Sequence, residues 1–185
     1  MVRVIWYNGM NFKTALDRSM LVTKGDKRIT NRSNPFVMVG AGLDTETSKF
    51  DNSEKYVVYE NGTKKITDKE RYTNALKSYI YLWQFSVGDD VYLCHDLMLL
   101  DSFMSDLDAA VSELHPRATL IIWDCNISFE FSFIMPIIRH NITKLFARNK
   151  SNILAFKYGK HLQFRECLGV FGKSLKDIAK NYTTT

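Results

Sequence analysis

The chain has 185 residues, 45% of them hydrophobic and 24% charged, and it carries a formal net charge of +5 at pH 7. Its length is typical of one globular domain with a full hydrophobic core, and two domains would be cramped. No run approaches the roughly 20 apolar residues that cross a bilayer, and the N-terminus lacks a signal-peptide pattern, so we expect no membrane association and a cytoplasmic location.

The positive charge is concentrated at the N-terminus. Residues 1–35 hold seven basic and two acidic side chains, which gives 7 − 2 = +5 and leaves residues 36–185 neutral overall. We expect a basic, partly ordered segment followed by the main domain. Such a segment predicts an acidic partner, nucleic acid first among them, and a flexible solvating tail is the alternative. The candidate nucleic-acid-binding residues in it are Lys24, Lys27, Arg28 and Arg32.

The predicted elements begin with strands. After a short apolar run (VRVIWY) and a loop at 23–35, the pattern predicts a buried strand over 35–45, a strand and turn around Asn61-Gly62, and a hairpin over 78–95 that turns at Gly88-Asp89. Apolar residues at spacings of three and four then predict a helix over 97–114, ended by His115-Pro116.

In the second half of the chain, predicted strands and helices follow one another. A strand is predicted over 118–126 and a helix over 127–141, which Pro136 should kink or shorten. Short strands follow at 142–149, 152–160 and 161–170, with Gly159 at a turn, and a last helix is capped by Ser174. This order predicts a mixed α/β domain with helices packed on a sheet.

The three cysteines, Cys94, Cys125 and Cys167, are an odd number with wide spacing. Disulfide-stabilised small domains carry even numbers of cysteines in a dense framework. We therefore expect reduced, mostly buried thiols.

The stretch GLDTETS places two carboxylates at the end of a predicted strand. Asp44 and Glu46 share one face and Thr45 points to the other. A cation between the two acids would offset their repulsion, and a solvated turn is the alternative. On the helix after the fourth strand, Asn126 and Glu130 share a face. If the two strands are neighbours, Asp44, Glu46 and Glu130 converge, and their oxygens favour Mg²⁺ or Mn²⁺.

Two motifs carry a resemblance. GLDTETS resembles the first exonuclease motif of family B DNA polymerases, and NISFEFSFI resembles the second. The segments YIYLWQFSVGDD, LIIWDCNISFEFSFI and LQFRECLGVFGKSLKDIAKN are similar, in order and spacing, to the N-terminal proofreading domain of protein-primed polymerases from tailed phages. The resemblance covers most of residues 35–180. It implies an α/β, ribonuclease H-like mixed sheet flanked by helices, and metal-dependent removal of nucleotides from a 3′ end.

The resemblance also implies roles for single residues. Asp44, Glu46 and Glu130 would bind the metals and carry catalysis, while Asn126 and Phe129 would contact single-stranded DNA. Stacking of a base on an aromatic ring tolerates any sequence, which suits such a contact. Core packing is the alternative for Phe129.

The chain departs from the family in three ways. The third motif, a Tyr and an Asp on a following helix, is not found before the sequence ends, no polymerase region is present, and Cys125 stands where relatives often carry His. With one metal ligand missing, we expect 3′–5′ exonuclease activity to be weak or absent. The chain would then be a single-stranded DNA-binding remnant in the host-cell cytoplasm. The alternatives are a non-catalytic inhibitor of a host defence or replication factor, for example an anti-CRISPR protein, and a decayed fragment that still folds.

Overall fold

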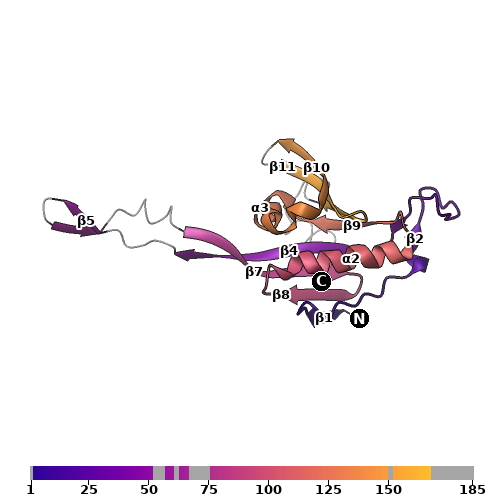
Figure 1. Cartoon of the computed structure of the whole chain (residues 1–185), viewed down its shortest axis with the longest axis horizontal. Helices are drawn as coiled ribbons and strands as arrows, with labels where there is room; N and C mark the ends of the chain where they lie inside the picture. Colours follow the sequence, from indigo (N-terminus) through magenta and orange to yellow (C-terminus); the bar gives the residue numbers. More distant parts are fainter. Residues whose placement is uncertain (1, 52–56, 61–62, 67–75, 150–151, 168–185) are drawn as a thin grey trace, which may run out of the picture.

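The computed structural model describes residues 2–51, 57–60, 63–66, 76–149 and 152–167 (Figure 1). The strands are β1 (Arg3–Trp6), β2 (Leu21–Val22), β3 (Phe36–Val37), β4 (Ala41–Asp51), β5 (Val57–Glu60), β6 (Thr63–Ile66), β7 (Leu76–Val87), β8 (Asp90–Cys94), β9 (Thr119–Asp124), β10 (Ile142–Asn149), β11 (Asn152–Tyr158) and β12 (Leu162–Glu166). The helices are η1 (Arg18–Met20), α2 (Leu99–Leu114), α3 (Ile127–Ile138) and η2 (Arg139–Asn141).

One mixed sheet organises the molecule, in the order β1-β8-β7-β4-β9-β12-β11-β10. Strand β7 is antiparallel to both of its neighbours, β8 and β4, while β9 runs parallel to β4 and β12 runs parallel to β9. Strand β1 adds in parallel to β8, and β3, paired with β2, adds in parallel to the start of β9. The predicted mixed α/β architecture is therefore confirmed.

Both α-helices cover the same face of this sheet. Phe103 of α2 contacts Phe85 and Tyr92, with ring centroids 4.9 and 4.8 Å apart, and Phe131 of α3 contacts Phe156 at 5.1 Å. The helical stripe predicted for α2 is buried as expected at Leu100, Phe103, Met104, Leu107 and Val111. No helix covers the opposite face in the part of the chain that the structure describes, and we call it the open face.

Most predicted elements are confirmed, and two of them differ in their extent. The strand expected over 35–45 is divided into β3 and β4, and β4 continues to Asp51. The helix expected over 127–141 ends at Ile138, because Pro136 lies in its last turn and η2 follows. The hairpin of β7 and β8 turns at Gly88, as predicted. Gly88 has a φ of 61°, which glycine adopts readily because it has no Cβ. The turn at Asn61-Gly62 and the final helix at Ser174 lie outside the described residues.

The basic N-terminal segment packs with the sheet. Arg3 forms two hydrogen bonds to Asp90 across the β1–β8 pair, at 2.8 and 2.7 Å. Residues 23–35 form the predicted loop, and the end of α2 holds it: a ring nitrogen of His115 lies 3.0 Å from the carbonyl of Thr30. None of the described helices is both long and apolar enough to cross a bilayer.

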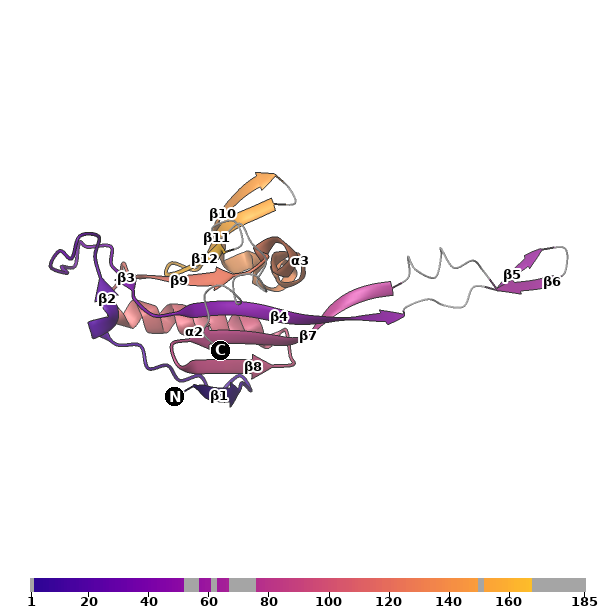
Figure 2. The ribbon, with the colours of Figure 1, turned by 180° about the vertical axis from the view of Figure 1, so that it is seen from behind.

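The β4–β7 pair extends beyond the rest of the sheet. The two strands pair as far as Asp51 and Leu76, whereas β9 reaches β4 only at Gly42 and Leu43 and β8 reaches β7 no further than Trp83. The outer part is thus a two-stranded ribbon that projects from the body (Figure 2).

At the far side of the sheet, β10 pairs with β11 through three register irregularities, and all its residues but the first are exposed.

The β11–β12 turn offers a test of the fold. Gly159 has φ +57°, and a Cβ there would lie 2.6 Å from the carboxyl carbon of Asp108, whose Oδ1 accepts hydrogen bonds from the next two backbone N–H groups. Gly159→Ala should therefore lower the free energy of unfolding by about 2 to 4 kcal/mol, from backbone strain plus overpacking. Gly25→Ala is the matched control, because Gly25 has φ +75° but open space around it. The control should lose only about 1 kcal/mol in urea denaturation. Equal losses in the two variants would contradict the packing described for this turn.

Candidate functional site

Strand β4 presents its side chains as predicted. Leu43 and Thr45 are buried under the helices, while Asp44 and Glu46 are exposed on the open face. Strands β4 and β9 are neighbours, with Gly42 opposite Trp123. The strand arrangement on which the predicted carboxylate site depends is therefore present.

Glu130 lies on the other side of β4. It falls on the same stripe of α3 as Ile127, Phe131 and Ile134, so it is turned toward the sheet and only 4% exposed. Its carboxylate accepts a hydrogen bond from the hydroxyl of Thr45. The structure thus places Glu130 on the helix-covered side of β4 and the pair Asp44 and Glu46 on the open face, and, besides burial, the charges of this pair still contribute to the raised pKa of Glu130. Within the described ranges, no three His, Cys, Asp or Glu side chains are grouped to hold a metal ion, and the three-carboxylate site stays a prediction.

Asp124 is the acidic residue that the sequence interpretation missed. It ends β9, is 1% exposed, and neither of its carboxyl oxygens has a hydrogen-bond partner among the described residues. Burial first, and next the charge of Glu130, raise its pKa to about 8. Burial also raises the pKa of Glu130 to about 7, against the hydrogen bond from Thr45, which lowers it. Alternation along β9 from the buried Leu120 could have revealed that Asp124 faces inward.

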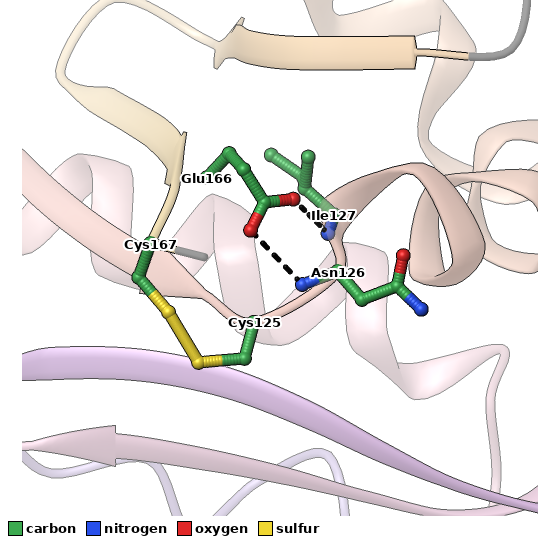
Figure 3. The surroundings of a disulfide bond; sticks show 5 residues. All are labelled: Cys125, Asn126, Ile127, Glu166 and Cys167. Carbon is green, nitrogen blue, oxygen red and sulfur yellow. Dashed lines mark hydrogen bonds between the residues drawn. A yellow bond between two sulfur atoms is a disulfide. The ribbon is translucent and has the colours of Figure 1, made fainter. Parts of the chain in front are cut away.

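A disulfide joins Cys125 to Cys167 directly after the ends of β9 and β12 (Figure 3). The expectation that these cysteines are reduced thiols is wrong. Because β9 and β12 are parallel with Asp124 opposite Glu166, the next residue on each strand is brought to a Cα–Cα distance of 5.2 Å. That distance is suitable for a disulfide. Cys94 is a buried free thiol, as predicted.

Glu166 fixes the start of α3 beside this disulfide. Its two carboxylate oxygens accept hydrogen bonds from the backbone N–H groups of Asn126 (3.1 Å) and Ile127 (2.9 Å) (Figure 3). A carboxylate at a helix N-terminus satisfies unpaired donors and complements the helix dipole. Asn126 adopts φ +85°, so the chain turns sharply from β9 into α3. The disulfide and the Glu166 cap together hold the strand ends against the first turn of α3.

The residues predicted to contact DNA are accessible. Asn126 is exposed, and Phe129 is 42% exposed, with its ring in edge contact with Phe133 at 5.1 Å. Core packing therefore does not account for Phe129. The candidate basic residues are all exposed in the loop 23–35, namely Lys24, Lys27, Arg28 and Arg32.

Comparison with known proteins gave no match: neither a protein-family model, nor a curated protein, nor a solved structure is similar to this chain.

Proposed function

We propose that this chain is a ribonuclease H-like, exonuclease-derived domain of phage or mobile-element origin that binds single-stranded nucleic acid and a divalent cation, with weak or absent 3′–5′ exonuclease activity. The observation that carries the proposal is the order and direction of β8, β7, β4, β9 and β12: three antiparallel strands, then two parallel to β4, with one helix before β9 and one after it. Such an arrangement is expected of a ribonuclease H-like domain. Acidic side chains lie on both central strands, β4 and β9, which supports a site at their junction.

Buried oxygen donors near this junction fit a hard cation. The unpartnered oxygens of Asp124 and the carboxylate of Glu130 are of the type that Mg²⁺ and Mn²⁺ prefer. These two side chains would hold the ion, which would supply positive charge for polarising a phosphodiester. Asp44 and Glu46 lie on the open face and would not complete the same ligand set. This reduced set supports weak or absent catalysis.

Cation binding tests the proposal without relying on activity. Mn²⁺ or Mg²⁺ should raise the melting temperature of the intact protein, because a ligand that binds the folded state stabilises it. The increase should disappear in Asp124→Asn/Glu130→Gln and persist in the control Asp44→Asn/Glu46→Gln. Loss of the increase in the control variant instead would place the cation on the open face.

Cleavage of a 5′-labelled single strand measures the enzymatic part. We expect at most a faint ladder from the intact protein with Mn²⁺. Strong cleavage that is lost in Asp44→Asn/Glu46→Gln would show an efficient exonuclease and contradict the expectation of weak catalysis. If neither cation binding nor binding of a single strand is observed, the proposed function fails.

A non-catalytic inhibitor is the second candidate. The separation of Glu130 from Asp44 and Glu46 favours it, because a binding protein needs no assembled catalytic group. The projecting β4–β7 ribbon favours it as well, since its paired backbone extends away from the body of the sheet (Figure 2). The test is inhibition of DNA cleavage by a purified CRISPR effector at stoichiometric protein, with Asp44→Asn/Glu46→Gln expected to inhibit equally.

A further inference from the structure

A groove of about 660 Å³ crosses the open face beside β9, away from the buried carboxylates. It lies where β2 and β3 meet β9 and β12, and residues from all four strands or the adjoining loop line it. The residues that matter here are Lys24, Phe36, Met38, Ile121, Trp123 and Arg165. No acidic residue is among the described residues that line it.

The groove combines an accessible aromatic surface with positive charge. Trp123 is 41% exposed, although it lies in a central strand. Its register neighbours on the same face are Gly42, which has no side chain beside the indole, and Arg165, which brings a guanidinium. Lys24 lies at the side formed by β2. Neither Lys24 nor Arg165 forms an ion pair with a carboxylate anywhere in the described ranges.

We propose that this groove binds a single strand of nucleic acid, with one base stacked on Trp123 and the adjoining phosphates on Lys24 and Arg165. Stacking platforms in positively charged grooves are the general means of binding single strands without sequence preference. A planar ring attached to an anion matches the groove, and a base-paired duplex cannot offer its bases to the indole. This inference rests on the proposed function and adds a binding site to it.

The surroundings of the groove fit a chain longer than one nucleotide. The loop that begins at Lys24 also exposes Lys27, Arg28 and Arg32, which extend the positive surface. In the other direction, Asp44 follows Gly42 by two residues and therefore lies on the same face as Trp123. A strand bound in the groove would thus pass from the basic loop toward the exposed carboxylates of β4.

Fluorescence anisotropy with a 5′-labelled oligothymidine of about 12 nucleotides, a length within the usual range for such sites, tests the groove. EDTA is present, so that cation binding cannot contribute. Trp123→Ala should weaken binding about 5-fold to 100-fold, the usual range for loss of one stacked base. Trp6→Ala is the matched control, because Trp6 is 56% exposed on β1, outside the groove. An abasic strand of equal length should show no difference between intact protein and Trp123→Ala.

Charge is tested separately. Lys24→Ala and Arg165→Ala should each weaken binding and lower the slope of log affinity against log salt by about 1. Lys144→Ala is the control of equal charge, since Lys144 is exposed on β10 and does not line the groove. Trp123→Phe should restore most of the affinity lost in Trp123→Ala, which separates stacking from misfolding.

Two outcomes would overturn the inference. If the strand binds but depends on Asn126 and Phe129 rather than on Trp123, the groove is not the site and the proposed function stands. If the intact protein binds no single strand, the groove proposal fails, while cation-dependent stabilisation still tests the rest of the proposed function. A self-association that Trp123→Ala abolishes, without any DNA binding, would assign the groove to a second copy of this chain and would also refute the inference.

Discussion

Replacing Asp124 by Asn should stabilise the fold more at pH 8 than at pH 5. The carboxyl group is buried without a hydrogen-bond partner among the described residues, and its pKa is raised to about 8 by burial and by the nearby Glu130. The unfolded chain loses this proton near the ordinary pKa of about 3.9. Between these two values the folded state holds a proton that the unfolded state does not. Stability therefore falls by up to about 1.4 kcal/mol for each pH unit as the pH rises through this window.

Asn carries no titratable proton, so the advantage of Asp124→Asn over the parent should grow across the same window. Urea denaturation at several pH values between about 5 and 8 measures it, with the cation removed by EDTA. Asp26→Asn is the control, because Asp26 is exposed in the loop 23–35 and its replacement should change the free energy of unfolding little. A constant difference between Asp124→Asn and the parent at all pH values would refute the environment described for Asp124.

Loss of the disulfide should cause the second large effect. Cys125 and Cys167 are 42 residues apart, and closing a loop of that length restricts the unfolded chain by about 4 kcal/mol in the chain-entropy description. Cys125→Ser/Cys167→Ser should lower the free energy of unfolding by about 2 to 4 kcal/mol. Amide exchange at Asn126 and Ile127, which donate hydrogen bonds to Glu166 beside the disulfide, should be faster in the variant than in the oxidised protein.

Thiol counting is the direct check. The unfolded, unreduced protein should react with one equivalent of a thiol reagent, from Cys94, and the reduced protein with three. Cys94→Ala is the stability control, since it removes a thiol that forms no disulfide. Three reactive thiols before reduction would show that the bond is absent. Because stable disulfides are typical of oxidising compartments, this count also bears on the cytoplasmic location, which stays a prediction.

The sequence predicted the elements well because each depends on local pattern. The periodicity of α2, the apolar run of β9 and the turn at Gly88 are properties of neighbouring residues, and all three elements are found in the structure. Pairing was harder. The disulfide was missed because it depends on the register between β9 and β12, which a spacing of 42 residues does not reveal.

The candidate site was predicted in part. The shared face of Asp44 and Glu46 follows from strand alternation and is confirmed. The direction of Glu130 was not predicted, because the helical face it shares with Asn126 does not say which side of the sheet α3 covers. The packing of Phe131 on β11 decides this and turns Glu130 inward. Asp124 was passed over because it was treated as the end of a strand rather than as a member of its buried face.

The irregular strand β10 has a consequence for how copies of this molecule meet. A long regular strand at the margin of a sheet is a template on which another chain can add, and repetition of that step produces filaments. Strand β10 interrupts its ladder at three points and carries exposed Lys144 and Arg148, while β1, at the opposite margin of the described sheet, has only four residues. Bulges and positive charges of this kind hinder strand addition. Concentrated protein should therefore resist polymerisation through its sheet margins.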